Sequence, residues 1–188
     1  LGNIITLEDL AAKGFTPADF KLWLYQGHYR AERNFTWEDL AAAHTRRLKW
    51  QNAYVATFQQ TSQEDRSLQG QLKNTTPHFA ELKTKLTDAL NDDLNSAAAF
   101  AIIDAELENM TLADWSGPVE ALFGLDFANT DRDADYEKLD AELKPLIEKR
   151  NQAREAKDWA TPDQIRDELA KKNLTLLDTP TGTIWQFI

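Results

Sequence analysis

Three short segments near the end of the chain decide its architecture: AREAKDW at residues 153–159, DQIRDEL at residues 163–169 and DTPTGTIW at residues 178–185. The first two have the composition and spacing of helices, and Pro162 suits the first turn of the second helix. In the third segment the apolar period changes from helical to alternating, and Pro180 and Gly182 favour a tight turn. These segments predict two helices followed by a β-hairpin over residues 174–187.

Upstream of this region, hydroxyl residues recur as helix-start signals. Each is followed by an acidic residue three positions later or by a proline at the first helical position. These residues are Thr6, Thr16, Thr36, Thr76 and Thr161. Between them the apolar spacing is helical, as in Leu40, Ala43 and Leu48. The sequence therefore predicts a mainly α protein, an antiparallel helical bundle followed by a small α+β module with a short hairpin.

Several segments interrupt the helical pattern. The polar residues 59–75 are expected to connect two long helices, and residues 91–95 and 116–118 are expected to break the helices that follow. Pro145 is expected to kink the helix that starts near Tyr136. The acidic, apolar-poor residues 129–135 cannot bury themselves, so the domain boundary is expected there.

Composition limits the function. The chain has 188 residues, a net charge of -10 and no cysteine, which excludes disulfides and thiolate metal sites. His28, His44 and His78 lack metal-ligand spacing, and no nucleophile lies beside a base, so neither a metal site nor a catalytic centre is expected. No apolar run is long enough to cross a membrane, and no targeting segment is evident, so a cytoplasmic location is expected.

The charge is unevenly distributed. Residues 51–140 contain six basic and seventeen acidic groups, whereas residues 1–50 contain seven and six, and residues 141–188 contain eight of each. The acidity of the middle is typical of a solvated helix surface. The two ends are therefore free to approach RNA, whose phosphates would repel the middle.

The C-terminal segments place groups suited to single-stranded RNA close together in sequence. Trp159 offers a ring on which a base can stack, and Arg154 offers a guanidinium fork. Asp163 and Asp178 can accept hydrogen bonds from base edges. A structural interpretation stays open, in which Trp159 is core, Arg154 pairs with a neighbouring glutamate and Asp163 only stabilises a helix N-terminus.

The same segments resemble the end of the bacterial cysteinyl-tRNA synthetases, which are class I aminoacyl-tRNA synthetases. That family has the pattern ARxAKDW, then ADxxRDxL, then LxDxPxGTxW, and here Pro162 replaces the alanine of the second motif. The resemblance implies that residues 136–188 are a small module that recognises a GCA anticodon. The positions that match its base-contacting residues are Arg154, Trp159, Asp163 and Asp178. The family's basic tail is replaced by residues 186–188, QFI, which suggests fewer phosphate contacts.

The resemblance extends over the whole chain in family order. It includes LGN at residues 1–3, which resembles the residues after the ATP-site KMSKS loop, then GHYR at 27–30, NF at 34–35 and LNDDLN at 90–95. It implies a stem-contact region with the first helices over residues 1–35 and a helical bundle over residues 36–128. His28 and Tyr29 are expected to pack a helix against its neighbours. Sugar-phosphate contacts are expected from Arg30, Arg33, Arg46 and Arg47, although Arg46 and Arg47 would also suit a solvated helix.

The resemblance also implies what else the system contains. The expected partners are tRNA-Cys and a catalytic domain upstream of Leu1, which would use ATP and zinc; no cofactor is expected in these residues, and a monomer is expected. Four interpretations remain: the tRNA-binding portion of a cysteine-tRNA ligase, inactive alone; a free-standing tRNA-binding or regulatory module; a ligase of mycothiol synthesis; and a helical scaffold. The complete C-terminal motif set disfavours the last two.

Overall fold

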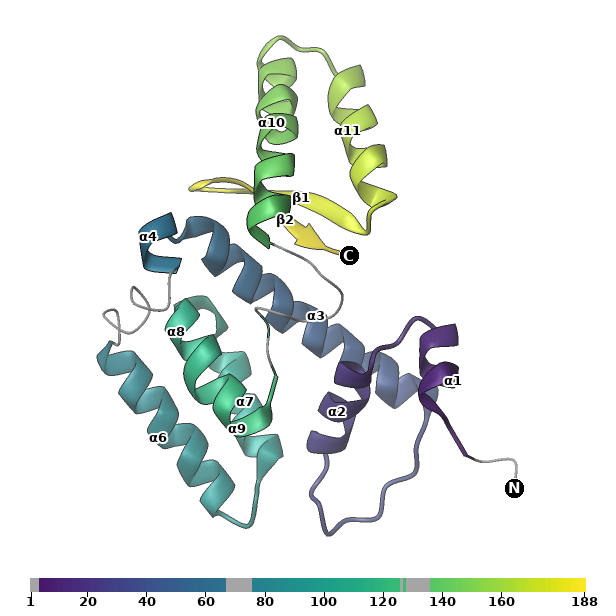
Figure 1. The fold of residues 1–188 in the computed structure, drawn as a ribbon, viewed down its shortest axis with the longest axis vertical. Helices are drawn as coiled ribbons and strands as arrows, with labels where there is room; N and C mark the ends of the chain where they lie inside the picture. Colours follow the sequence, from purple (N-terminus) through teal and green to yellow (C-terminus); the bar gives the residue numbers. More distant parts are fainter. Residues whose placement is uncertain (1–3, 67–75, 126, 128–135) are drawn as a thin grey trace.

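The computed structural model describes residues 4–66, 76–125, 127 and 136–188 (Figure 1). Its helices are α1 (Leu7–Ala12), α2 (Pro17–Tyr25), α3 (Trp37–Gln60), α4 (Gln63–Arg66), α6 (Pro77–Asn91), α7 (Ser96–Glu106), η1 (Leu107–Asn109), α8 (Leu112–Asp114), η2 (Trp115–Val119), α9 (Glu120–Phe123), α10 (Tyr136–Glu155) and α11 (Ala160–Ala170). Strands β1 (Leu174–Thr179) and β2 (Gly182–Phe187) form an antiparallel hairpin. The predicted mainly α fold with a C-terminal hairpin is confirmed.

Four of the five predicted helix starts are confirmed. Thr6, Thr16, Thr36 and Thr76 each accept a hydrogen bond from the backbone N–H three residues on. The fifth prediction is wrong, because α11 begins at Ala160 and not after Thr161. Asp158, and not Thr161, accepts the hydrogen bonds of the first free backbone N–H groups of this helix.

The predicted interruptions have mixed outcomes. Helix α6 ends at Asn91 as expected, and Asp93 and Leu94 adopt positive φ before α7 begins. The predicted helix break at residues 116–118 is wrong, because η2 is a π-helical turn that accommodates Pro118 between α8 and α9. Helix α3 runs to Gln60, past the predicted start of the polar connection. Residues 67–75 of that connection and the expected boundary at 129–135 lie outside the described residues.

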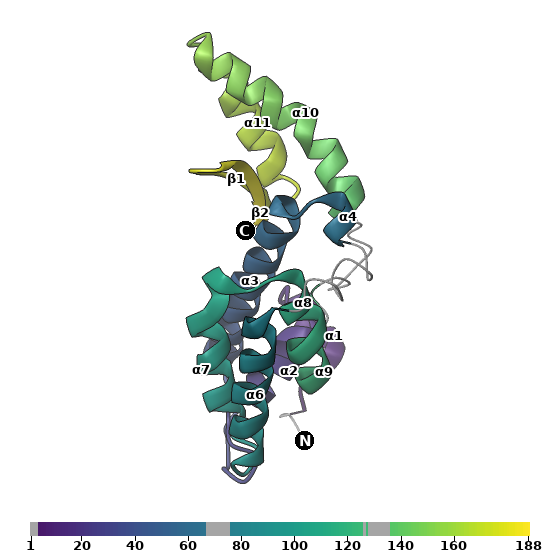
Figure 2. The same cartoon turned by 90° about the vertical axis from the view of Figure 1, so that its left-hand side faces the viewer.

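Helix α3 is the common support of the fold. Figures 1 and 2 show α1 and α2 against its N-terminal part, α7 beside its middle and the hairpin at its C-terminal end. Trp50, near the middle of α3, is fully buried and donates its indole N–H to Asp104 of α7 over 2.6 Å. Its ring also meets Phe100 edge-on, with the centroids 5.0 Å apart. This one helix therefore contacts α2, α7, α8 and the hairpin.

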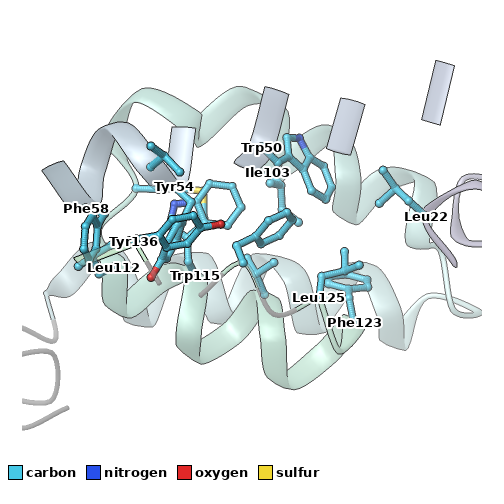
Figure 3. Packing of buried hydrophobic residues seen from close by; sticks show 14 of the residues in the cluster. Leu22, Trp50, Tyr54, Phe58, Ile103, Leu112, Trp115, Phe123, Leu125 and Tyr136 are labelled. Atoms are coloured by element: carbon cyan, nitrogen blue, oxygen red, sulfur yellow. The ribbon is translucent and has the colours of Figure 1, made fainter. Parts of the chain in front are cut away.

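One apolar cluster extends from the bundle into the C-terminal elements. Tyr136, at the start of α10, is buried, and its ring centroid lies 5.8 Å from those of both Tyr54 and Phe58 on α3 (Figure 3). On its other side the same ring lies 6.0 Å from Trp185 of β2. The C-terminal elements thus share a continuous core with the bundle instead of burying a separate one.

A buried ion pair joins α2 to α3. Asp19 is fully buried, and its carboxylate accepts hydrogen bonds from Arg47 Nε over 2.5 Å and from Thr16 N over 2.7 Å. His44 Nδ1 lies 3.1 Å from the same carboxylate. Arg47 is also buried and donates to Gln51 over 3.0 Å. The charges are therefore compensated inside the core, as burial requires.

This environment makes the contribution of Asp19 to the free energy of unfolding pH-dependent. Burial alone would raise the pKa of Asp19, but the hydrogen bonds from His44 and Arg47 and the positive charge of Arg47 outweigh it, so the pKa lies well below the ordinary value. Since the folded-state pKa is depressed, the stabilisation is present above the unfolded-state pKa, near 3.9. It is lost as the pH falls from there toward the folded-state pKa.

We expect Arg47→Met to lower the free energy of unfolding by about 3–5 kcal/mol, because it leaves the Asp19 carboxylate buried without its charge partner. Urea unfolding followed by circular dichroism measures this change. The matched control is Lys49→Met, an exposed position on the same helix, which should change stability by less than about 0.5 kcal/mol. An equal, small effect of both substitutions would contradict the role of the buried pair.

Candidate nucleic-acid interface

The turn between α10 and α11 has a defined hydrogen-bond structure. Asp158 N donates to Ala153 O over 2.9 Å and Lys157 N donates to Arg154 O over 3.1 Å, the two bonds of a Schellman motif. Lys157 occupies the left-handed position with φ +59°, where glycine is usual. The AREAKDW segment therefore ends α10 in a tight reversal.

Asp158 starts the next helix from the same turn. Its carboxylate accepts from Ala160 N over 3.1 Å and from the Thr161 hydroxyl over 2.6 Å. The hydrogen bonds that Asp158 accepts lower its pKa, and the largest contribution comes from Thr161. The carboxylate is therefore charged at the N-terminus of α11. The turn is thus fixed from both sides of Trp159.

Trp159 is held on this turn with its side chain in solvent. It is 63% exposed, which makes it the most exposed tryptophan of the described residues. The open interpretation that Trp159 is core is therefore wrong. Figure 1 shows that the α10–α11 turn lies at the end of the C-terminal elements farthest from the bundle. An exposed indole at a rigid turn is suited to stacking on an unpaired base.

Asp178 on β1 binds two arginines of α10. Arg150 donates to both carboxylate oxygens, over 2.9 and 3.0 Å, and Arg154 Nη1 donates to Oδ2 over 2.6 Å. The Thr183 hydroxyl adds a fourth hydrogen bond of 2.9 Å. The carboxylate thus has about as many donors as it can accept. Arg154 pairs with Asp178 and not, as the open structural interpretation had it, with a neighbouring glutamate.

This arginine pair dominates the ionisation of Asp178. The hydrogen bonds from Arg150 and then Arg154 hold the pKa of Asp178 well below its ordinary value, against a small opposing effect of burial. Asp178 and Arg154 remain about half exposed, whereas the Arg150 side chain is mostly covered. The cluster therefore presents a charged, oriented guanidinium to solvent at Arg154.

Asp163 does not join this cluster through any contact among the described residues. It lies in the first turn of α11, is exposed and forms an ion pair of 3.1 Å with Arg166 one turn later. The interpretation as a helix N-terminal residue therefore fits its position, and it leaves the carboxylate accessible. Arg150, Arg166 and Leu176 line a small cavity of about 30 Å³ between α10, α11 and β1.

The four arginines expected to contact sugar and phosphate lie in different environments. Arg30 is exposed and pairs with Asp93 over 3.0 Å, and Arg46 is partly exposed and pairs with Asp104 over 2.9 Å. Arg33 is exposed, lies over the Trp23 ring and donates to Trp23 O. Arg47 is in the core with Asp19, so it is not accessible to a phosphate in this structure, and the expectation for it is corrected here.

Two of the motifs quoted from the sequence meet in space. In the GHYR segment, Tyr29 donates to Asp93 Oδ1 over 2.8 Å and His28 Nε2 lies 3.4 Å from Asp93 Oδ2. His28 and Tyr29 were expected to pack a helix, but they lie in the connection after α2 and bind the left-handed turn before α7. This contact anchors a long connection to the bundle.

Arg150 and Thr183 are the residues of this site that the sequence interpretation missed. Arg150 precedes Arg154 by four residues, so both lie on one face of α10. That spacing was a usable signal for Arg150. Thr183 is found only through the register of the hairpin, which places it opposite Asp178.

The region that carries these residues matches a known protein family. Residues 137–185 match the family described as "Cysteinyl-tRNA ligase anticodon binding domain". That range contains the capped turn, the Asp178 cluster and most of the hairpin. Across nearly its whole length the chain also aligns with curated cysteine--tRNA ligases. Residues 137–185 therefore carry an anticodon-binding domain of the cysteinyl-tRNA ligase type.

Three relatives illustrate the extent of the match with this ligase family. The cysteine--tRNA ligase of Novosphingobium aromaticivorans is 32% identical over 98% of this chain and 38% of its own length. The Campylobacter lari ligase is 29% identical over 99% and 42%, and the Salmonella agona ligase 30% over 99% and 41%. The chain thus spans about two fifths of the length of these ligases.

Two further properties concern the described residues alone. No group of three or more His, Cys, Asp or Glu side chains among them is arranged to hold a metal ion. Within the same ranges, no helix has both the length and the apolar character that crossing a membrane requires.

We expect Arg150→Ala to raise the pKa of Asp178 toward its ordinary value, because the largest cause of the depression is removed. The carboxyl carbon shift of Asp178, followed by NMR during a pH titration, measures this change. Lys149→Ala, an exposed neighbour, is the control and should leave the titration unchanged. An unchanged Asp178 titration in Arg150→Ala would refute the assignment.

We expect Asp158→Ala to destabilise the protein by about 1 kcal/mol, because two backbone N–H groups of α11 lose their cap. The rate of amide hydrogen exchange should increase more at Ala160 and Thr161 than at the other amides of α11. Asp167→Ala, at an exposed position farther along α11, is the comparison and should change stability by no more than about 0.5 kcal/mol. Unaltered exchange at both amides would show that the turn is fixed by other contacts.

Proposed function

We propose that this chain binds tRNA-Cys and that residues 136–188 recognise its GCA anticodon. The observation that supports this most directly is Trp159, a 63% exposed indole on a doubly capped turn, in the segment that matches an anticodon-binding domain. Base stacking on an exposed aromatic ring is a general mode of single-stranded RNA recognition.

In this proposal Arg154 makes the polar contact to a base. Its guanidinium is about half exposed, and Asp178 holds it by a 2.6 Å hydrogen bond. Since Asp178 already accepts hydrogen bonds from Arg150, Arg154 and Thr183, its main role would be to orient Arg154. A direct base contact by Asp178 would require one of these donors to leave. Asp163, exposed in the first turn of α11, remains available to accept from a base edge.

The bundle would contribute sugar and phosphate contacts. Arg30, Arg33 and Arg46 keep at least part of their side chains in solvent, so they remain the candidates within residues 1–128. The acidic partners Asp93 and Asp104 would hold two of these guanidinium groups in place and weaken their attraction for phosphate. We therefore propose a modest electrostatic share of binding in this region.

The catalytic steps are assigned to a different part of the ligase. The relatives are more than twice as long as the aligned region, and we propose that ATP-dependent attachment of cysteine, with its zinc, belongs to a catalytic domain that corresponds to their remaining length. The residues described here would hold the tRNA and check its anticodon. We propose that the protein does this as a monomer in the cytoplasm.

The proposed function is tested by binding of the purified chain to a tRNA-Cys transcript and to the same transcript with an altered anticodon, at two salt concentrations. Trp159→Ala should weaken binding of the native transcript by about 1–3 kcal/mol, that is, roughly 5- to 150-fold. Arg154→Ala should remove the preference for GCA. Lys172→Ala, an exposed cation of the same module, is the control for charge.

Arg46→Ala should weaken binding of both transcripts about equally. It should also lower the slope of log binding constant against log salt concentration by about 1, as expected for the loss of one phosphate contact. Equal binding of the native and altered anticodons by the unaltered chain would contradict anticodon recognition. A loss from Arg154→Ala that is the same for both transcripts would reject the base contact alone.

A further inference from the structure

The outer edge of β2 lies against α3 and not in solvent. The sheet has only two strands, so β1 occupies just one edge of β2. On the other edge the backbone N–H and C=O groups of Trp185 and Phe187 point away from β1 toward α3. An unpaired strand edge normally needs cover or a partner. A two-stranded hairpin is also marginally stable by itself.

Two side-chain amides of α3 pair with this edge. Asn52 donates to Phe187 O over 3.0 Å and accepts from Phe187 N over 2.9 Å. Gln59 donates to Trp185 O over 2.8 Å and accepts from Trp185 N over 3.0 Å. Each amide therefore makes the two bonds that a residue of a neighbouring antiparallel strand would make. We call Asn52 and Gln59 the amide clamp.

The spacing of the amide clamp suits a helix lying along a strand. Asn52 and Gln59 are two helical turns apart and lie on one face of α3, about 10.5 Å from each other along its axis. Trp185 and Phe187 are two residues apart, about 6.8 Å along β2, on the same edge. The difference is small enough for the flexible side chains to span. The match involves four hydrogen bonds to two backbone positions.

Two kinds of contact hold the hairpin on α3, the apolar packing of Trp185 and the amide clamp. Trp185 is fully buried beside Tyr136, and its indole N–H donates to Asp140 over 3.3 Å. A shift of one residue would turn Trp185 out of the core, so the apolar packing already opposes it. The amide clamp adds a directional constraint, because the same shift turns the backbone N–H and C=O groups of β2 away from α3.

We propose that Asn52 and Gln59 are positioning residues that fix the anticodon-binding module relative to the bundle, so that one tRNA can contact both at once. This inference rests on the proposed function. Contacts at two fixed sites reinforce each other only when the connection holds them at the matching separation. Loosening the clamp should therefore weaken binding of a whole tRNA and spare binding of an isolated anticodon stem-loop.

The clamp itself is tested by amide hydrogen exchange in Asn52→Leu and Gln59→Leu. Leucine keeps much of the side-chain volume and removes both hydrogen-bonding groups. Exchange should accelerate about tenfold or more at Phe187 in the first variant and at Trp185 in the second. It should change little at Ile184 and Gln186, whose amides alternate toward β1. Gln60→Leu, the exposed next residue of α3, is the matched control.

The positioning role is tested with two RNAs, the full tRNA-Cys transcript and its isolated anticodon stem-loop. Each leucine variant should bind the full transcript about tenfold more weakly than the unaltered chain and bind the stem-loop equally well. Unchanged stem-loop binding would also show that the module is folded. An equal loss for both RNAs, or no loss for either, would overturn the positioning role.

The two proposals fail in different ways. If the unaltered chain binds neither RNA, the proposed function is overturned, and the positioning role falls with it. If the unaltered chain binds both RNAs and the variants match it, anticodon recognition stands and only the positioning role is rejected. Unaltered exchange at Trp185 and Phe187 in the variants would reject the clamp whatever the RNA results.

Discussion

The structure depends on one constraint: a two-stranded hairpin can neither bury its own face nor satisfy its own outer edge. Both needs are met by helix α3, which supplies Tyr54 and Phe58 to the shared apolar cluster and Asn52 and Gln59 to the strand edge. Helices α10 and α11 pack against the hairpin and carry the exposed Arg154 and Asp163. The candidate RNA-binding face therefore has its foundation in a helix of the bundle.

The same helix has three kinds of neighbour along its 24 residues. Just before its midpoint, Arg47 pairs with Asp19 of α2. In its middle, Trp50 reaches Asp104 of α7. Its final turns face the hairpin. Because polar contacts with defined geometry occur in each part, the relative placement of the surrounding elements is specified more narrowly than apolar packing would specify it.

Local signals in the sequence were sufficient for four of the five helix starts and for the hairpin, but not for the π-helical turn that accommodates Pro118. The threonine caps were predictable because each cap and its partner lie three residues apart. Distant pairings were not predictable. Arg47 was expected to contact sugar and phosphate or to lie on a solvated helix face, and only its approach to Asp19 places it in the core. Asn52 and Gln59 are polar residues of a long helix, and their partners are more than 120 residues away. The residue type of Trp159 does not reveal whether its side chain is buried, because its exposure depends on the structure of the turn around it.

The separation between α3 and β2 along the chain has a consequence for biosynthesis. Strand β2 is translated after every helix that it contacts, so the ribosome releases α3, with its two amides, long before their partners exist. The bundle can form early, whereas the last module must wait for Trp185 and Phe187 before it docks. Such long-range pairing is slow to form. During this interval Asn52 and Gln59 can remain hydrated, so the surface of α3 that waits for β2 is polar beside the apolar Tyr54 and Phe58.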